Sequence, residues 1–190
     1  MFLDLEKHLV FYGTYHIHPR NVAIHIMFVP VLMFTMMLWA SNVALPVTAS
    51  FVPPEYLNLS TLTSVIYAIG YVLMEPIAGG LLLPFVIGQS LAGTYCVQHY
   101  PGANKWAGII QAGSWIAQFI GHGVWEKKAP ALVDNLVQAL FLAPLFVWIE
   151  VLFKFGYRPE LRKRMEAQVK IKRAELDARG KKGAEVKKEL

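Results

Sequence analysis

Residues 22–41 form a stretch of 20 positions without a charged side chain. At a rise of about 1.5 Å per residue, a helix of this length crosses the roughly 30 Å hydrocarbon layer of a lipid bilayer. Four more apolar runs follow, at residues 57–74, 79–97, 105–125 and 131–153. We expect a helical membrane protein, because lipid offers no hydrogen bonds and each spanning segment must satisfy its own backbone.

The composition agrees with this expectation and separates the chain into two parts. Hydrophobic residues make up 55% of the sequence and charged residues only 16%, which is too apolar for an ordinary soluble domain. Of the 18 lysines and arginines, 12 follow Tyr157. We predict an all-α, polytopic membrane bundle of four to five apolar segments over residues 1–157. Residues 158–190 are expected to form a basic, solvated helix or tail without a continuous apolar stripe.

The N-terminal region is predicted to be a short amphipathic helix over residues 2–15. Phe2, Leu5, Leu9 and Tyr12 follow one another at helical spacing, which is typical of a helix on a membrane surface or against a bundle. Asn21 is then expected to cap the first apolar segment.

The distribution of charge predicts the orientation. If the first four segments all cross the membrane, the loops at one side carry only Glu55 and Lys105. The other side is cytosolic by the positive-inside tendency, and the basic tail leads us to expect that the fifth segment re-enters at Pro144. Residues expected at the cytosolic face are Arg20, His25, His122, Lys127 and Lys128.

The last four residues suggest a compartment. The chain ends Lys187-Lys188-Glu189-Leu190, which resembles the dilysine retrieval signal of endoplasmic reticulum membrane proteins and, less closely, the luminal Lys-Asp-Glu-Leu signal. Either reading favours the endoplasmic reticulum membrane.

The fourth apolar segment carries a polar stripe. Its members recur at steps of three and four residues, which places them on one face of a helix. Polar groups at this depth normally face the interior of a bundle or a wet cavity. The stripe consists of Gln111, Trp115, Gln118, His122 and Glu126.

Histidines gather where this stripe ends. His16 and His25 lie at the start of the first segment and His122 at the end of the fourth, so the topology brings all of them to one depth. Imidazole is a good ligand for iron, zinc and copper. A single cysteine, Cys96, excludes a site made of several cysteines of one chain. We predict that His16, His25 and His122 bind a metal ion.

Neighbouring polar residues have less certain roles on sequence grounds. Glu126 lies one turn beyond His122, where it either orients a histidine ring or forms a surface ion pair with Lys127 or Arg20. His99 closes the third segment and should lie on the opposite side of the membrane. It joins the site only if the third or fourth segment is not a simple crossing.

Three blocks of the sequence resemble the membrane 2-hydroxy fatty acid dioxygenases, a fungal and bacterial family named for the metabolism of phytosphingosine to odd-numbered fatty acids. The resemblance covers most of residues 5–157. Its motifs are Phe11-Tyr12-x-x-Tyr15-His16, Asn21-x-x-x-His25, and Gln118-Phe119-Ile120-Gly121-His122-Gly123-x-Trp125-Glu126-Lys127-x-x-Pro130-Ala131-Leu132-x-Asp134-Asn135-Leu136, followed by Leu142-Ala143-Pro144.

The resemblance implies an iron(II)-dependent α-oxidation in the endoplasmic reticulum. A 2-hydroxy fatty acid, such as one from phytosphingosine breakdown, would react with dioxygen, lose carbon dioxide and leave an acid one carbon shorter. The family's histidines correspond to His16, His25 and His122, and a further one near His99 makes that residue a candidate fourth ligand.

The resemblance and the residue chemistry together suggest further roles. Arg20 or Lys127 would anchor the substrate carboxylate, and Tyr15 or Asn21 would hydrogen-bond to the substrate hydroxyl or the reacting oxygen. Glu126 is the third candidate for a catalytic role. The expected cofactor is Fe²⁺, and the expected partners are the 2-hydroxy fatty acid, dioxygen and the lipid bilayer, with no nucleic acid.

Two other functions are weighed against this one. Membrane hydroxylases and desaturases with two iron ions use more histidine ligands than the six histidines of this chain. A small membrane scaffold or metal transporter would use Gln111, Gln118 and His122 to line a path. A transporter should place its histidines along the depth of the membrane, whereas the three here gather at one face.

Overall fold

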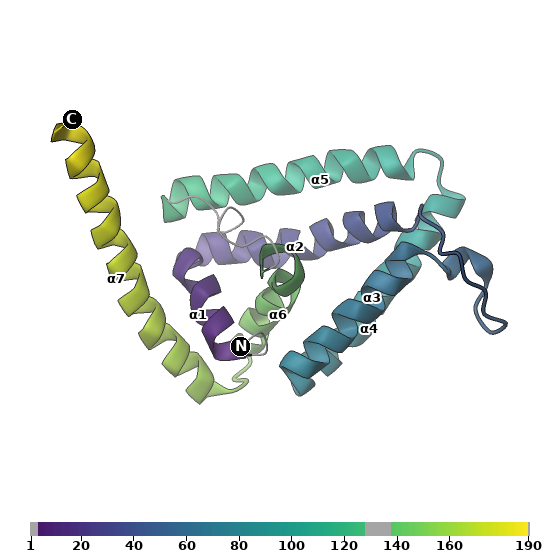
Figure 1. Ribbon diagram of the computed structural model, residues 1–190, viewed down its shortest axis with the longest axis horizontal. Coiled ribbons are helices and arrows are strands. Elements are labelled where there is room, and N and C mark those ends of the chain that lie inside the picture. Colours follow the sequence, from purple (N-terminus) through teal and green to yellow (C-terminus); the bar gives the residue numbers. More distant parts are fainter. Residues whose placement is uncertain (1–3, 128–137, 190) are drawn as a thin grey trace.

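A computed structural model describes residues 4–127 and 138–189, with side chains for residues 4–127 and 140–178. Within these residues the protein is all-α, with seven α-helices (Figure 1). They are α1 Leu5–Tyr15, α2 Pro19–Ala40, α3 Leu59–Met74, α4 Pro76–His99, α5 Ala103–Ile120, α6 Ala143–Lys154 and α7 Pro159–Glu189. A short 3₁₀-helix, Pro54–Tyr56, and two π-helical segments, η2 Gly121–Glu126 and η4 Gln138–Leu142, complete the elements.

Helices α2 to α5 run back and forth along the bundle, as four successive crossings would (Figure 1). Helix α4 is continuous through Pro84 and does not break or re-enter. It packs closely because small residues let backbones approach: a Cβ at Gly79 would overlap the Tyr71 backbone, and one at Gly93 would lie 3.0 Å from Leu38 Cα. Glycines thus allow α4 to lie close to α3 and α2 at these two positions.

Not every expected crossing has the length and composition of a membrane span. Within the described chain, α2 with 22 residues and α4 with 24 are long and apolar enough to cross a bilayer. Helix α3 is apolar but has only 16 residues. Helix α6 has 12 residues and bends by 116° into α7, as a broken span or a re-entrant segment does. The fold therefore contains two candidate spans, or three if this bent pair counts as one.

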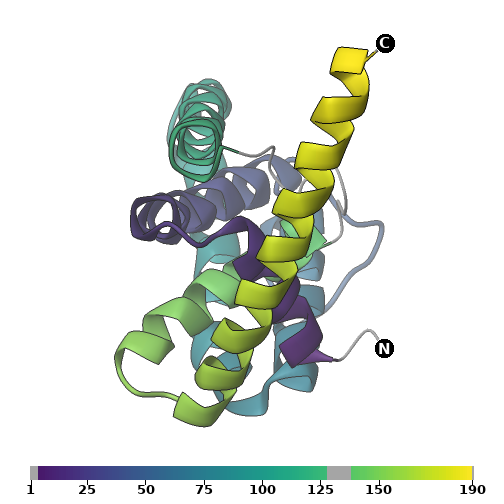
Figure 2. The same cartoon turned by 90° about the vertical axis from the view of Figure 1, so that its left-hand side faces the viewer.

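The N-terminal helix has the predicted position of its apolar residues, with Leu5, Leu9 and Tyr12 buried. Phe2 lies outside the described residues. Helix α1 packs across α7 (Figure 2), and Leu161, Met165 and Val169 of α7 belong to the same buried core. The expected C-terminal helix is present, but the prediction that it lacks an apolar stripe is wrong for its first half. The division of the chain at residue 157 stays a prediction.

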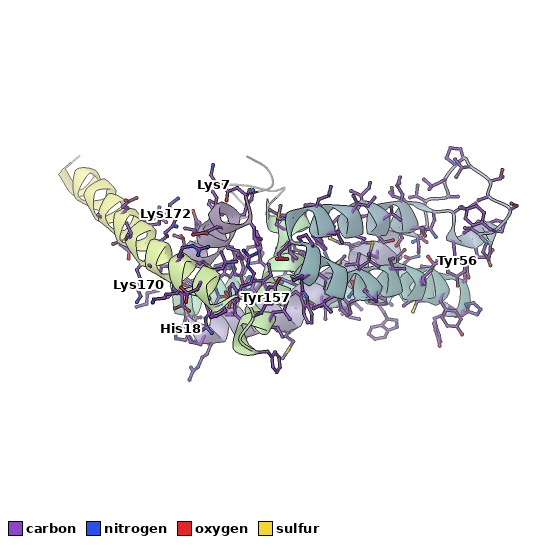
Figure 3. All side chains as sticks on the ribbon, turned by 90° about the horizontal axis from the view of Figure 1, so that it is seen from below. Lys7, His18, Tyr56, Tyr157, Lys170 and Lys172 are labelled. Carbon is purple, nitrogen blue, oxygen red and sulfur yellow. The ribbon has the colours of Figure 1, made fainter. Side chains whose placement is uncertain are left out.

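Several basic side chains lie at one end of the bundle. Lys7, His18, Lys170 and Lys172 lie at the end formed by α1, α7 and the start of α2, whereas Tyr56 lies at the opposite end (Figure 3). The end of α5 returns to the first of these ends (Figure 1). The fold thus brings together the start of α2 and the segment that follows α5.

Candidate metal centre

Three helical elements each deliver one histidine to a common point. His16 caps the C-terminus of α1, His25 lies in the second turn of α2 and His122 lies in η2. One ligand nitrogen from each ring lies within 4.8 Å of the others. The ring centroids are 4.3 Å apart for His16 and His25, 4.8 Å for His16 and His122, and 4.9 Å for His25 and His122. The structure thus brings together the three histidines that the sequence singled out.

Backbone carbonyls fix the orientation of two of these rings. His16 Nδ1 lies 2.8 Å from the carbonyl oxygen of Tyr12, and His25 Nδ1 lies 2.9 Å from that of Asn21. A carbonyl only accepts, so each Nδ1 carries the proton and each Nε2 keeps a free lone pair. This arrangement, with one ring nitrogen held by a hydrogen bond and the other available, is typical of metal-binding histidine.

Two buried ring nitrogens lack any partner within the described part of the chain. They are His16 Nε2 and His122 Nδ1. A buried polar atom without a hydrogen bond is costly, and a metal ion bound by the cluster would remove that cost. Burial, followed by the neighbouring His25 and His122, holds the pKa of His16 well below its usual value. Burial also lowers the pKa of His122, while the nearby Glu126 acts in the opposite direction and raises it. Neutral imidazoles are the form that binds metals, so the residues fit such an ion.

Glu126 is buried beside the cluster and holds the start of α2. Its Oε1 accepts hydrogen bonds from the backbone N–H groups of Ile17 and His18, both at 2.8 Å, and from Asn21 Nδ2 at 3.3 Å. A carboxylate at a helix N-terminus is favourable because the N–H groups there are otherwise unpaired. Glu126 therefore connects η2 to the turn between His16 and α2, without a hydrogen bond to a histidine ring.

An arginine of the C-terminal helix completes this arrangement. Arg173 of α7 donates from NH1 to Glu126 Oε2 at 3.1 Å and to the carbonyl oxygen of Thr14 at 2.9 Å. Its NH2 donates to the carbonyl oxygen of Glu126 at 2.9 Å. The ion pair expected for Glu126 with Lys127 or Arg20 is instead made with Arg173. Sequence analysis missed Arg173 because it lies in a tail rich in cations, and spacing does not distinguish one from another.

The other predicted site residues are only partly brought to the centre. Asn21 is fully buried, donating to Glu126 and, at 3.5 Å, to the carbonyl oxygen of Tyr15. It does not cap α2; His18 does, accepting from the N–H of Arg20 at 3.2 Å. Tyr15 packs against Phe11 at a ring distance of 5.2 Å. The side chains of Arg20 and Lys127 are exposed.

His99 lies apart from the three histidines. It ends α4, where it is exposed, and its ring stacks on that of Tyr95 at 4.0 Å. The 18 residues of α5 lead from this end of the bundle back to η2 (Figure 1). The group of three does not include His99, so we leave it out of the proposed ligand set.

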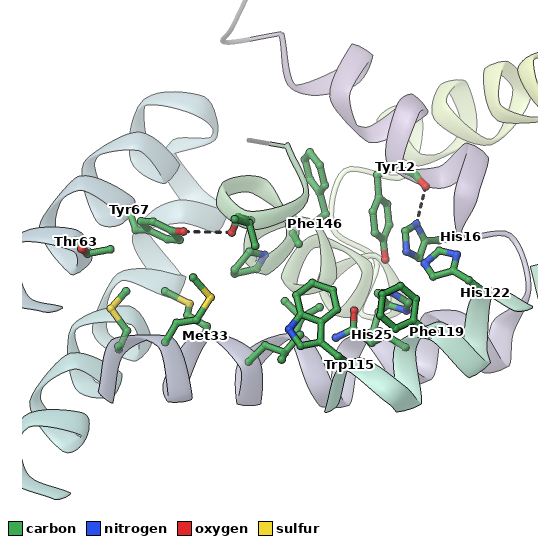
Figure 4. A pocket seen from close by; sticks show the side chains of 18 of the residues that line it. Tyr12, His16, His25, Met33, Thr63, Tyr67, Trp115, Phe119, His122 and Phe146 are labelled. Carbon is green, nitrogen blue, oxygen red and sulfur yellow. Dashed lines mark hydrogen bonds between the residues drawn. The ribbon is translucent and has the colours of Figure 1, made fainter. Parts of the chain in front are cut away.

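A cavity of about 320 Å³ begins at the histidines and extends between α2, α5, α3 and α6 (Figure 4). The trio and Tyr12 are at its polar end, with Trp115 and Phe119 near them, and Met33 is farther along. The predicted stripe of α5 thus faces the interior: Gln118 lines this cavity, and Gln111 accepts a hydrogen bond from Thr35 of α2. Neither Tyr15, Arg20 nor Lys127 is among the described residues that line it.

Tyr12 is a cavity residue that the sequence did not single out as functional. Its ring stacks on the His16 ring at 4.2 Å, with 14° between the planes. Its hydroxyl is buried and has no hydrogen-bond partner among the residues described. Burial, with smaller effects of Glu150 and Glu126, raises the pKa of Tyr12 well above its usual value, so the phenol stays protonated. In the sequence, Tyr12 belongs to the apolar stripe of α1, so the pattern predicts a packing residue. It does not indicate that the hydroxyl of Tyr12 lies in a cavity beside His16.

Gly121 permits the close approach of η2 to α2. A Cβ at this position would overlap Asn21 Oδ1, whereas a Cβ at Gly123 would meet nothing within 4 Å. We expect Gly121→Ala to lower the free energy of unfolding by about 1–3 kcal/mol, since overpacking shifts a buried side chain. Denaturant unfolding of the detergent-solubilised protein measures this, with Gly123→Ala as the matched control. Equal effects of the two substitutions would contradict the close packing described here.

Comparison with known proteins gives two matches. Residues 2–155 match the protein family described as Mpo1-like, 2-hydroxy-palmitic acid dioxygenase. The chain is 39% identical over 176 residues to the 2-hydroxy-palmitic acid dioxygenase MPO1 of Saccharomyces cerevisiae, covering 92% of this chain and 94% of the yeast protein. No solved structure matches the chain.

Proposed function

We propose the following function from the premise that this chain belongs to the Mpo1-like family of 2-hydroxy-palmitic acid dioxygenases. The protein is a dioxygenase that oxidises 2-hydroxy fatty acids, 2-hydroxyhexadecanoic acid among them, to the acid one carbon shorter and carbon dioxide. The observation that carries the proposal is the group of His16, His25 and His122 at the polar end of an apolar cavity.

The reaction balances without any further reductant. The bond between C1 and C2 of the acid breaks, C1 leaves as carbon dioxide, and C2 becomes the carboxyl carbon of the product. One dioxygen molecule takes up the four electrons released and supplies the additional oxygen atoms, and one water molecule forms. An enzyme of this kind needs a place for the acid, a place for dioxygen and a group that activates both.

We assign the activating group to iron(II) held by His16, His25 and His122. The free lone pairs and the low pKa of His16 support this ligand set, and the dioxygenase activity named for the family calls for a redox-active ion, which zinc is not. When bound, iron(II) would supply a Lewis acid for the carboxylate and hydroxyl of the substrate and a redox-active centre through which electrons of the substrate pass to dioxygen. Three protein ligands leave coordination positions open for this purpose.

The protein's own residues then bind and orient the acid. The hydrophobic residues along the cavity, with Trp115 and Phe119 near the histidines, would hold the acyl chain and exclude water. Among the described lining residues there is no lysine or arginine, so we no longer assign the carboxylate to Arg20 or Lys127. Glu126 and Asn21 are positioning residues in this account, because their hydrogen bonds hold His16, α2 and η2 together.

We propose that the hydroxyl of Tyr12, and not that of Tyr15, donates a hydrogen bond to the substrate or the reacting oxygen. Tyr12→Phe should lower kcat about 10–100-fold with metal content retained, since the variant keeps the ring stack on His16 and loses only the donor. Single-turnover rates and metal analysis check this. A loss of the same size in Tyr15→Phe and none in Tyr12→Phe would contradict the assignment.

The setting that we propose is the endoplasmic reticulum membrane, with the metal centre at the cytosolic face. The apolar helices α2 and α4 support the membrane, and the resemblance to the family of phytosphingosine metabolism supports the compartment. The cavity opens to the surface of the bundle, where its lining residues Met36 and Phe119 are 38% and 48% exposed. This opening would let a lipid-like acid enter from the bilayer. The transporter alternative is less well supported, because the three histidines gather at one end of the bundle instead of along it.

The test of this function is the fate of C1. Full-length protein in detergent, supplied with iron(II) and 2-hydroxyhexadecanoic acid labelled at C1, should release labelled carbon dioxide and leave an unlabelled acid of 15 carbons in a one-to-one ratio, with one dioxygen consumed. Retention of the label in the product acid would contradict the proposed reaction.

A further inference from the structure

One face of α2 lines the cavity at regular intervals. His25, Val29, Met33 and Met37 follow one another every four residues, so they stack along one side of the helix. All four are buried, with at most 6% of the side chain exposed, and all four line the cavity that begins at the histidines. The metal centre and the apolar part of the cavity therefore share one side of α2.

The far end of the cavity lies on α3. Thr63 and Tyr67 line it there, and Met33 lies between them and the end that holds His25 and Trp115 (Figure 4). Ala40, the last residue of α2, is the most distant lining residue on this helix. It follows His25 by 15 residues, which is about 22 Å at the helical rise of about 1.5 Å per residue.

This length can be compared with that of an acyl chain. Carbon–carbon bonds of about 1.5 Å at angles near 111° advance an extended chain by about 1.25 Å per methylene. The carbons beyond C2 of a 16-carbon acid then extend over about 18 Å, which fits within the length of the cavity. Each step of four residues along α2, about 6 Å, corresponds to about five methylenes.

We propose that Val29, Met33 and Met37 determine which acyl chain lengths the enzyme accepts. The inference rests on the proposed function. With the carboxyl end of the acid at the histidines, Val29 contacts the first part of the chain, Met33 the middle and Met37 the part near its end. Methionine suits such a wall, because its unbranched side chain adapts to a flexible ligand.

Bulky substitutions at these positions should shorten the accepted chain in order. We would test Val29→Phe, Met33→Trp and Met37→Trp against saturated 2-hydroxy acids of about five to 18 carbons, so that acids shorter and longer than the expected limit of each variant are included. For each variant, kcat/KM should fall at least about tenfold for acids that extend beyond the new side chain and change little for shorter ones. The chain length at which the fall begins should increase by about five carbons from Val29 to Met33 and again from Met33 to Met37.

The same helix offers a matched control. Met27 also lies on α2 but is 64% exposed and does not line the cavity, so Met27→Trp should leave the chain-length profile as in the wild type. Metal content and thermal unfolding of each variant show whether the centre and the fold are retained. Where a tryptophan variant fails to fold, Met33→Phe and Met37→Phe provide smaller steps.

Binding of the same acids, measured by equilibrium dialysis, separates this inference from the proposed reaction. If the wild type binds the acids without releasing carbon dioxide, the proposed function fails, while a graded limit in binding would still support the three residues. If the wild type turns the acids over but the three variants show the wild-type profile, or a uniform loss at all lengths with metal retained, the inference is overturned.

Discussion

His122→Ala is expected to abolish both metal binding and turnover of 2-hydroxyhexadecanoic acid. His122 supplies one of three neighbouring imidazoles, and two remaining ligands hold an ion poorly. We expect turnover to fall by well over about 100-fold, more than the roughly 10–100-fold that loss of an outer hydrogen-bond partner of a ligand costs. Metal per chain and carbon dioxide release, measured on one preparation, check this result. His16→Ala and His25→Ala should behave in the same way.

His99→Ala is the comparison that separates the ligand set from histidines in general. His99 is the last residue of α4, where it is exposed and its ring stacks on that of Tyr95. It does not belong to the group of three histidines. We expect this variant to keep its metal and its turnover. Loss of metal from His99→Ala, or retention of metal and turnover by His122→Ala, would show that the ligands have been misassigned.

The second large effect is a loss of stability when Glu126 is replaced. Glu126→Ala leaves the N–H groups of Ile17 and His18 and the guanidinium of Arg173 without their shared acceptor. The side chain of Glu126 is 2% exposed and that of Arg173 is 18% exposed, so the remaining charge is poorly solvated. Loss of one partner of a buried pair costs about 3–5 kcal/mol. We expect a lower free energy of unfolding of that order and weaker metal binding.

Further variants distinguish this buried pair from an ordinary surface one. Arg173→Met should also destabilise the protein, and the combination with Glu126→Gln should cost less than the sum of the two, because the partners are in contact. Arg164, which like Arg173 lies on α7, forms an exposed ion pair with Glu6 of α1. Arg164→Met removes this pair and should change stability little. Additive effects of the Glu126 and Arg173 substitutions would contradict the contact.

The sequence predicted the convergence of the histidines because membrane helices alternate in direction. Once the segments that begin near His16 and end near His122 are taken as antiparallel, these residues must lie at one end of the bundle. The spacing of Gln118, His122 and Glu126 predicted their common face for a similar reason, although the chain passes into a π-helix at Gly121.

Contacts that depend on packing were beyond sequence reasoning. Arg173 contacts Glu126 because α7 packs on α1, with Leu161, Met165 and Val169 of α7 in the buried core. These three apolar residues recur every four positions among many charged ones, which is a weak sequence signal for a buried helix face. Tyr12 differs from Tyr15 in lining the cavity, where its ring lies 5.3 Å from that of Phe146 of α6. Spacing along α1 does not show which of the two tyrosines does so. Residues Asp134 and Asn135 of the fifth segment lie outside the described residues.

The central claim is that His16, His25 and His122 form a single metal site, and metal content tests it most directly. Full-length protein purified in detergent and reconstituted with iron(II) should hold close to one iron ion per chain, and the triple alanine variant should hold none above background. Equal iron in the two proteins, with both folded, would contradict the account.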